Sequence, residues 1–359
     1  MKKEEFEKIN YLEQQGLKNP YRIKKLIEKA IRFNKLDFSN LVVFTEAASK
    51  NYVVTPIIAA MAGAKVYAIT TDSIYGKAKD IERFTHKFAE FCDVKDKIQV
   101  IFQKKKEIIS KADIITNLGF VRPINREFIF NLKKTAVIPL MYETWEFRNE
   151  DLDLKACQDK SILVLGTNEH HPKLKTLDYF GQLVLKKIFE LNLELYGLKV
   201  MIIADEFFGP PIIKSLKDNN IEVIRNFNQT AEVDVLVIVY HKTPKVIIGK
   251  NGLITAKKLK QKYPFVSIIQ FCGNGVIDRD ALDKEGLQYI PKKAPKPGFM
   301  SWTLADLGPR PVIELHTAGL KVGEVMAKER LRGMGTEETK IMALKHSPAQ
   351  DFPSSYTKR

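Results

Sequence analysis

The sequence predicts an α/β protein made of two tandem Rossmann-like units, each with a parallel sheet covered by helices. Short apolar strands alternate with amphipathic helices over residues 41–140, and the alternation returns over residues 200–224. Pro-Ile-Ile stands at comparable places in the two halves, at residues 56–58 and 211–213. Strands that alternate with helices pair in parallel, because each helix carries the chain back to the start of the next strand.

The first half begins with two helices within residues 1–38, separated by stop signals at Gly16 and Asn19-Pro20. A strand at residues 41–44 and a helix that ends at Gly63 open the alternating region. The elements expected after them are a strand at 65–70, a helix at 78–92, a strand at 98–102, a helix at 104–111, a strand at 113–116, a helix at 125–132 and a strand at 135–140.

The second half contains a strand at residues 200–203, a helix at 211–217 and a strand at 221–224. An amphipathic segment at residues 174–193 joins the two halves, and a last apolar helix is expected at about residues 319–331. The tail after Gly335 is polar, and we expect it to be flexible.

The amino-acid composition is typical of a soluble globular protein. Of the 359 residues, 45% are apolar and 28% are charged, which is ordinary for a soluble globular protein. The longest apolar run, at residues 233–240, is far shorter than the ~18 residues of a membrane helix, and no secretory apolar stretch follows the charged start. Cys92, Cys157 and Cys272 form no CxxC pair, so neither a disulfide framework nor a zinc site is expected. We expect a cytoplasmic protein without membrane contact.

The chain is basic, with 58 Lys and Arg residues against 43 Asp and Glu residues and a net charge of +15. Residues 241–262 hold seven lysines and no acid, whereas both signs are mixed elsewhere. No repeated aromatic and basic pattern of the kind that stacks bases is present. We therefore expect a generic basic surface and not a nucleic-acid interface.

Several short motifs occur along the chain in an order that is typical of one protein family. They are Leu-Asp-Leu at 152–154 leading to Ile-Leu-Val at 162–164, Glu-Leu-Tyr-Gly-Leu-Lys-Val at 194–200, Asp-Val-Leu at 234–236 with Thr-Pro at 243–244, Gly-Leu-Ile at 252–254, Gly-Val-Ile-Asp-Arg-Asp-Ala-Leu at 275–282 and His-Thr-Ala-Gly at 316–319. The ordered set resembles the D-isomer-specific 2-hydroxyacid dehydrogenases of the formate and glycerate dehydrogenase type. The resemblance implies a flavodoxin-like domain, then an NAD-binding type of domain, with a cleft between them.

The resemblance also implies domain bounds. We expect N-terminal helices at 1–38, a catalytic and substrate domain at 39–172 plus 310–335, a dinucleotide-binding-like domain at 173–309 and a flexible tail at 336–359. Family members are commonly dimers, so the resemblance implies a homodimer.

Hydride transfer between NAD(P) and a carbon that bears a hydroxyl group is the chemistry that the resemblance implies. His316 stands where the family has its acid–base histidine, a role that suits a side chain whose pKa lies near neutrality. The alternative for His316 is a core or capping histidine at the start of the last helix.

The residues at the positions that bind substrate in the family differ from the family pattern. Gly273 stands where the family has an arginine that binds the substrate carboxylate, and residues 141–148, with Tyr142, Glu143, Trp145 and Glu146, replace a glycine-rich loop. At ~4 Å and an effective dielectric constant of ~20, a carboxylate here would repel an anionic acid by about 4 kcal/mol. We therefore expect a substrate that is not a simple 2-keto acid, with Glu143 or Glu146 contacting a hydroxyl or amine group. A solvated turn with Trp145 packed inward is the alternative.

The residues at the positions that bind the cofactor in the family also differ from the family pattern. The phosphate fingerprint reads Ala-Asp-Glu-Phe-Phe-Gly at 204–209 and keeps only its last glycine. Arg225 ends the second strand of this unit, where it would suit the 2′-phosphate of NADP, although it is equally an ordinary loop residue. NADP or NAD is the expected cofactor. The residues expected around it are Asp205, Phe208, Gly209, Pro210, Arg225, Tyr240, Cys272 and Gly273.

Ligands of open parallel sheets bind beyond the carboxyl ends of the strands, so polar residues there should face a small-molecule substrate. Those residues, with the linker after the first domain, are Thr45, Glu46, Asn117, Gly119, Tyr142, Trp145, Glu169 and His170. The adjacent His170 and His171 lack the helical H-x-x-x-H spacing, so no metal site is expected. Glu169 with one histidine and a distant ligand, or a hydrogen-bonded hinge, are the alternatives.

Two interpretations of function remain. The first is an NAD(P)-dependent oxidoreductase-like protein that acts on a small hydroxyl or carbonyl substrate through His316, Glu143 and Glu146. The second is a catalytically degenerate dehydrogenase homologue that serves as a ligand- or protein-binding scaffold, which the loss of the arginine and of two glycines favours.

Overall fold

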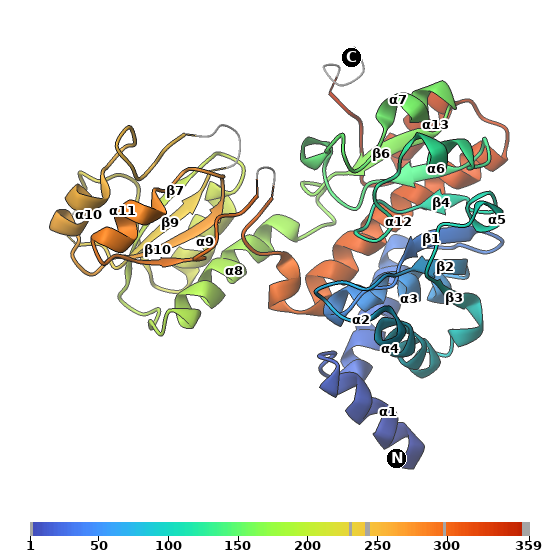
Figure 1. Cartoon of the computed structure of the whole chain (residues 1–359), viewed down its shortest axis with the longest axis horizontal. Coiled ribbons are helices and arrows are strands. Elements are labelled where there is room, and N and C mark those ends of the chain that lie inside the picture. Colours follow the sequence, from blue (N-terminus) through green and yellow to red (C-terminus); the bar gives the residue numbers. More distant parts are fainter. Residues whose placement is uncertain (1–2, 230–231, 241–244, 297–298, 354–359) are drawn as a thin grey trace. The chain divides into compact units, whose positions relative to one another are not determined.

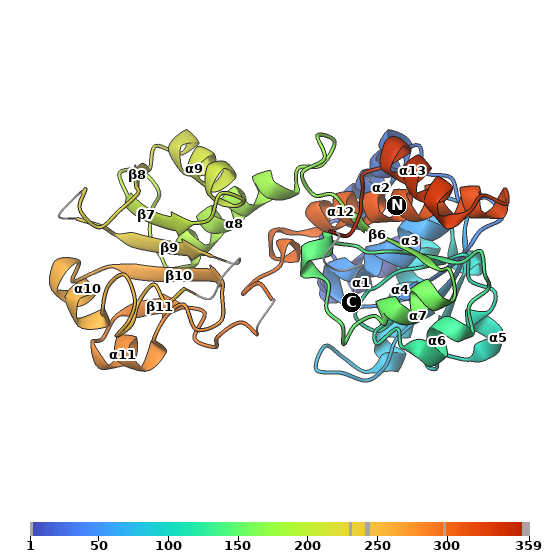
Figure 2. The same ribbon diagram turned by 90° about the horizontal axis from the view of Figure 1, so that it is seen from above.

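The computed structural model describes residues 3–229, 232–240, 245–296 and 299–353, and it divides into two compact units. Unit 1 comprises Met1–Leu174 with Gly308–Arg359, and unit 2 comprises Lys175–Leu307. Each unit has its own sheet with helices packed on it (Figures 1 and 2). The expected α/β class with two tandem Rossmann-like units is thereby confirmed.

Unit 1 is built on a seven-stranded sheet in the order β12-β6-β5-β4-β1-β2-β3. Strand β1 pairs in parallel with β2 and β4, whereas β12 runs antiparallel to β6. Strands buried on both faces are typical of a parallel sheet that lies between helical layers. Their bounds are β1 Val42–Glu46, β2 Lys65–Ile69, β3 Ile98–Ile101, β4 Ile114–Ile115, β5 Val137–Pro139, β6 Leu163–Thr167 and β12 Ala349–Gln350.

Helices cover both faces of this sheet (Figure 1). Ile114 of β4 points toward α12, which also lies against α2 and α3, whereas the next residue, Ile115, joins the core beneath α6 and α7. The helices are α1 Lys3–Gln14, α2 Pro20–Asn34, α3 Val54–Met61, α4 Ala78–Phe91, α5 Lys106–Ile109, α6 Arg126–Phe130, α7 Leu154–Asp159, α12 Pro309–Leu331 and α13 Thr336–His346, with 3₁₀ turns η1 Lys50–Val53, η2 Lys95–Lys97 and η3 Thr144–Glu146.

Helix α12 approaches the sheet closely because it carries glycine at positions 319 and 323. A Cβ atom on Gly323 would lie 2.9 Å from Ile114 Cγ2 and 2.9 Å from Pro139 Cγ. A Cβ atom on Gly319 would lie 2.7 Å from Met141 Sδ. Interiors are close-packed, so even one added methyl group at either position would push the helix away from the strands.

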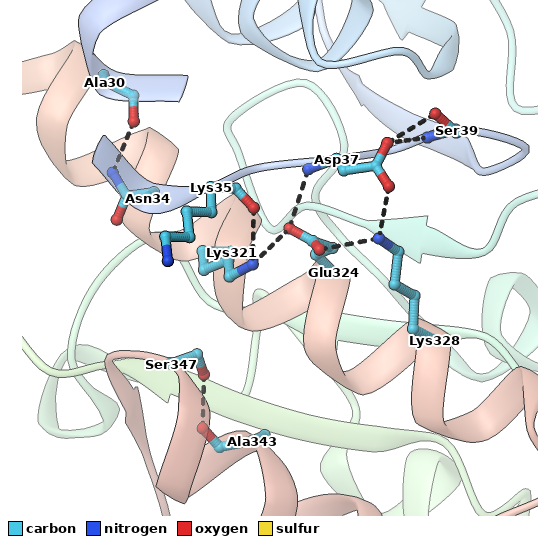
Figure 3. Close-up of polar contacts among 10 residues, drawn as sticks. All are labelled: Ala30, Asn34, Lys35, Asp37, Ser39, Lys321, Glu324, Lys328, Ala343 and Ser347. Atoms are coloured by element: carbon cyan, nitrogen blue, oxygen red, sulfur yellow. Dashed lines mark hydrogen bonds and ion pairs between the residues drawn. The ribbon is translucent and has the colours of Figure 1, made fainter. Parts of the chain in front are cut away.

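A buried carboxylate ties α12 to the segment that follows α2 (Figure 3). Glu324 is only 4% exposed and accepts hydrogen bonds from Asp37 N at 3.2 Å, Lys321 Nζ at 2.9 Å and Lys328 Nζ at 3.0 Å. Lys328 also donates to Asp37 Oδ2 at 3.0 Å. Hydrogen bonds from Ser39 and then from Lys328 hold the pKa of Asp37 well below its usual range. The network satisfies a charge that would otherwise be costly to bury.

Unit 2 is a five-stranded parallel sheet in the order β11-β10-β9-β7-β8. Helices α8 and α9 pack on one face, and α10 and α11 pack on the other (Figure 2). The strands are β7 Lys199–Ala204, β8 Glu222–Ile224, β9 Val235–Val239, β10 Ser267–Cys272 and β11 Gln288–Ile290, and the helices are α8 Thr176–Glu190, α9 Gly209–Asp218, α10 Ala256–Lys262, α11 Arg279–Lys284 and η4 Leu304–Leu307.

Strand order distinguishes the two units. Numbered within each unit, β1–β6 of unit 1 have the order 3-2-1-4-5-6 and the strands of unit 2 have the order 2-1-3-4-5. The first is the order of dinucleotide-binding Rossmann domains, and the second is flavodoxin-like. Strand order alone therefore gives unit 1 the Rossmann pattern and unit 2 the flavodoxin-like pattern. Alternation of strands and helices indicates parallel pairing but does not say which edge of the sheet each new strand joins.

The C-terminal segment also differs from the expectation. Residues 336–346 form α13 and residues 349–350 form β12, so this part of the chain is not a loose tail; residues 354–359 lie outside the described part. Helix α12 begins at Pro309 and not near residue 319, because proline is well tolerated in a first helical turn. In the described part of the chain, no helix has both the length and the apolar character needed to cross a bilayer.

Replacing Glu324 by Gln should lower the free energy of unfolding by about 1–3 kcal/mol, because two lysines lose their buried partner. Urea denaturation of the full chain measures this loss. Glu337→Gln, on the exposed side of α13, is the control and should change stability little. Equal effects of the two substitutions would show that the Glu324 network does not hold α12 in place.

Candidate functional site

Polar side chains gather at the carboxyl edge of the unit 1 sheet. Glu46 ends β1, Asn117 follows β4, Glu143 follows β5 and Glu169 follows β6. These four strands are neighbours in the order β6-β5-β4-β1. The carboxyl ends of parallel strands meet at one edge, so the structure brings together residues that are far apart in the sequence.

Glu46 is a buried carboxyl at this edge, with 5% of its surface exposed. Its Oε2 accepts a hydrogen bond from Phe120 N at 3.1 Å, and a Cβ atom on Gly119 would lie 3.1 Å from the same oxygen. Burial raises the pKa of Glu46 to about 6, although hydrogen bonding to Phe120 and the charge of Arg122 oppose the shift. A carboxyl that titrates near neutrality at a strand end is a candidate for proton transfer or for binding.

The boundary between β1 and β4 carries three further buried polar groups. The hydroxyl groups of Thr45 and Thr116 are hydrogen-bonded to each other at 2.8 Å. Asn117 Oδ1 accepts from Met141 N at 2.8 Å, whereas Asn117 Nδ2 is buried and has no hydrogen-bond partner among the described residues. A buried amide without an acceptor is costly, so this group is suited to donate to a ligand.

Three acids form a cluster beyond β5 and β6. Glu143 is buried; its Oε2 accepts from Trp145 Nε1 at 2.8 Å and its Oε1 accepts from Glu169 N at 3.0 Å. Burial, with the charge of Glu143 in addition, raises the pKa of Glu146 to about 7. Burial and then the charges of Glu146 and Glu143 raise the pKa of Glu169 well above its ordinary value. The cluster therefore favours a proton, a cation or a hydrogen-bond donor.

The nearest arginines do not neutralise this cluster fully. Arg122 Nη1 and Arg148 Nε both bind Asp151 Oδ2, at 2.7 Å and 2.8 Å. Arg148 also lies 5.8 Å from the centre of the half-buried Tyr142 ring. The guanidinium groups are thus shared with Asp151, and they only partly offset the raised pKa of Glu146.

His316 lies about two turns inside α12, and not ahead of this helix as the motif predicted. It is 4% exposed, its Nδ1 is hydrogen-bonded to Thr55 Oγ1 at 2.6 Å, and its ring centre is 5.9 Å from that of Tyr52. Burial lowers the pKa of His316 to about 4. The imidazole is therefore neutral at pH 7, which suits a hydrogen-bonding role better than proton shuttling. His170, by contrast, is exposed in the loop after β6.

The phosphate position expected in unit 2 is filled by the protein itself. Asp205 Oδ1 accepts from Phe207 N at 3.0 Å and from Phe208 N at 3.2 Å, just before α9 begins at Gly209 and Pro210. Phe208 is buried, and its ring packs on Phe180 at a centroid distance of 4.7 Å. The amide groups that would receive a diphosphate therefore already bind a carboxylate.

Among the other unit 2 residues expected around the cofactor, Tyr240, Cys272 and Gly273 lie together at the carboxyl ends of the neighbouring strands β9 and β10. Arg225 is exposed after β8, and its backbone N donates to Gln229 Oε1 at 2.6 Å. Cys272 is buried, and burial raises the pKa of its thiol to about 12. Gly273 has φ 89°, and a Cβ atom there would lie 2.6 Å from Tyr240 O, so this glycine serves the close approach of two strand ends.

Sequence reasoning missed three features of the site. They are Thr116, the unpaired amide of Asn117 and the group formed by Arg122, Asp151 and Arg148. Thr116 ends the strand predicted at residues 113–116, so the strand-end rule could have found its hydroxyl group. The pairing of Asp151 between two arginines had no signal, because it depends on loops of unknown path. Among the described residues, no group of three His, Cys, Asp or Glu side chains could hold a metal ion.

Solved structures of similar fold include one of the subunits of dipicolinate synthase from two species. The protein from Bacillus halodurans is 12% identical over 82% of this chain and 99% of that chain, with a TM-score of 0.51. The protein from Bacillus subtilis is 10% identical over 84% of this chain and 100% of that chain, with a TM-score of 0.50. A D-isomer specific 2-hydroxyacid dehydrogenase from Lactobacillus delbrueckii ssp. bulgaricus also matches, at 12% identity over 81% and 98% of the two chains, with a TM-score of 0.41.

No protein-family model and no curated protein matches the sequence. The fold that the predicted resemblance implies, two Rossmann-like units in one chain, is confirmed by the likeness to the two dipicolinate synthase subunits. At 10–12% identity the likeness concerns the fold alone, so function has to be argued from the site.

The raised pKa of Glu46 predicts a dependence of stability on pH. Between pH 4.5 and about 6 the unfolded carboxyl loses its proton while the folded one keeps it, so this contribution to stability falls as pH rises. Glu46→Gln should remove this loss. The free energy of unfolding of the variant, compared with that of wild type, should therefore be about 1–2 kcal/mol higher at pH 8 than at pH 5. Thermal melts at both pH values test this, with Glu150→Gln on the surface as control. If the stability difference between the variant and wild type were the same at both pH values, the raised pKa of Glu46 would be contradicted.

His316 should remain neutral throughout the physiological range. Its ring signals in an NMR pH titration should show a midpoint below pH 5, because burial penalises the cation. Since the unfolded ring binds a proton below pH 6.5 and the folded ring does not, His316 should destabilise the fold as pH falls from 6.5 toward 4. A midpoint at or above 6.5 would instead support an acid–base role.

Proposed function

We propose that this chain is an oxidoreductase-like protein that binds NADP or NAD and acts on a small hydroxyl or carbonyl compound other than a simple 2-keto acid. The observation that carries the proposal is the set of buried polar groups at the β1–β4 boundary of a 3-2-1-4-5-6 sheet. Strand order reverses at that boundary, and open parallel sheets bind their ligands there. Thr45, Glu46, Thr116 and Asn117 would line the site.

The dinucleotide would lie in unit 1 and not in unit 2. The loop after β1 continues with Ala-Ala-Ser at residues 47–49, and Lys50 is exposed at the start of η1, which leads into α3. Small residues before a helix N-terminus, followed by a lysine, suit an anionic phosphate. In unit 2 a diphosphate would instead meet the carboxylate of Asp205 at the start of α9.

The substrate would present a hydroxyl or amine group to the acidic cluster. Glu143, Glu146 and Glu169 prefer a proton or a donor nearby, as the burial of Glu143 and the raised pKa values of Glu146 and Glu169 indicate. A substrate carboxylate at ~4 Å would be repelled by about 1–4 kcal/mol for effective dielectric constants between ~80 and ~20. Glu46 or Glu146 would then be the proton-transfer group, because burial places each of their pKa values near neutrality.

A homodimer is expected from the resemblance only, because dehydrogenases of this type are commonly dimers. The cytoplasmic location is expected from the composition and the cysteine pattern. Sedimentation of the purified chain measures the oligomeric state directly.

A binding scaffold without turnover is the second candidate. The buried, neutral His316 favours it, since a histidine with a pKa of about 4 is a poor acid at pH 7. In that case ligand binding at the β1–β4 boundary would persist while redox activity on alcohols and amines would be absent.

Calorimetric titration of the full chain with NADH and NADPH tests the proposal. Asn117→Asp keeps the oxygen that accepts from Met141 N and removes the buried donor, so it should weaken binding roughly tenfold or more. Asn131→Asp, at the end of α6, is the matched control and should bind normally.

Arg225→Asp distinguishes the two units. If the cofactor lies in unit 1, the substitution should leave both affinities and their ratio unchanged. A selective loss of NADPH affinity would place the cofactor in unit 2, as the family resemblance implies. Absence of binding by either cofactor would refute the oxidoreductase proposal.

A further inference from the structure

A cavity of about 570 Å³ lies at the amino-terminal edge of the unit 1 sheet, opposite the edge that carries the candidate functional site. Its walls come from the segments that precede β5 and β6, from the end of α12 and from the start of α13. None of its lining residues belongs to the candidate functional site. The lining residues that matter here are Phe130, Lys134, Lys160, Arg330 and Thr336.

Three cations of this wall lack a counter-charge. Lys134, Lys160 and Arg330 form no ion pair within the described part of the chain. Burial, together with the charge of Lys134, lowers the pKa of Lys160, as expected where like charges face one cavity. An anion in the cavity would relieve this repulsion.

The acid that lines the cavity is already neutralised. Asp159 pairs with Arg126 Nη2 at 3.0 Å and with Lys155 Nζ at 3.2 Å. These ion pairs place two more cations, Arg126 and Lys155, close to the cavity. The local field favours an anion, and the charge of Asp159 does not cancel it.

Two of the three cations, Arg330 and Lys160, are held in place by backbone carbonyl groups. Arg330 Nη1 donates to Met334 O at 2.8 Å, and Arg330 Nη2 donates to Lys134 O at 2.9 Å and to Ser161 O at 3.4 Å. Lys160 Nζ donates to Phe130 O. Arg330 Nε is buried without a partner among the described residues. Groups that are fixed before binding lose little freedom when a ligand arrives.

We propose that this cavity is a binding site for a small phosphate-bearing anion. Lysine and arginine are the side chains that recognise phosphate, and the start of the eleven-residue helix α13 at Thr336 opens onto the same space. Glu338 accepts from Gly335 N at 3.1 Å at this helix start, so the lysines and Arg330 carry most of the attraction. The cavity is within the size range of small-ligand sites. The inference is independent of the proposed oxidoreductase function.

Inorganic pyrophosphate is the probe, titrated calorimetrically into the full chain at constant ionic strength maintained with chloride. Wild-type protein should bind it saturably. The double variant Lys134→Ala with Lys160→Ala should bind roughly tenfold more weakly or worse. The matched control removes two exposed lysines of α2, Lys25 and Lys29, and should bind as wild type does.

Two further variants separate the possible causes of a loss. Lys134→Arg with Lys160→Arg keeps both charges and should retain binding, which excludes misfolding of the wall as the reason for a loss. Asn117→Asp should leave pyrophosphate binding unchanged, because it alters the β1–β4 boundary only. The proposal is overturned if wild type shows no saturable binding, if both alanine pairs weaken it equally, or if Asn117→Asp abolishes it.

Discussion

Close contact between α12 and strands β4 and β5 determines the geometry of unit 1. Gly319 and Gly323 remove the side chains that would separate helix from sheet, and Met141 and Ile114 occupy the space gained. Glu324 then anchors the same helix to the segment after α2 through a buried network. The position of His316 against Thr55 and the position of Met141 beside Asn117 both depend on this contact.

Burial has opposite consequences for the two kinds of polar group at the carboxyl edge. It raises the pKa of Glu46 and Glu146 to values near neutrality, which leaves them able to exchange protons. It lowers the pKa of His316 so far that the ring stays neutral. The same physical cause therefore leaves the carboxyl groups, and not His316, with pKa values close to neutrality.

The alternation of strands and helices was sufficient to predict the fold class and the strand ends that carry Thr45, Glu46 and Asn117. Strand order was not predictable, because an added strand can join either edge without a change in its own apolar pattern. The helix at residues 336–346 was hidden by its composition, since Thr339 and Ala343 are its fully buried residues. The neutral state of His316 depends on burial by α3 and η1, which its own motif does not encode.

The order of the two units along the chain has a consequence for synthesis. Unit 2 is encoded between Leu174 and Gly308, so its sheet is complete before the ribosome has made α12. The N-terminal part of unit 1 must wait with the α12-facing side of β4, β5 and β6 uncovered until residues 309–331 emerge. At ~5–20 residues per second, translation of unit 2 would keep that apolar surface exposed for on the order of ten seconds. Nascent chains are therefore most vulnerable to aggregation during this interval, and a chaperone that binds apolar strands would act then.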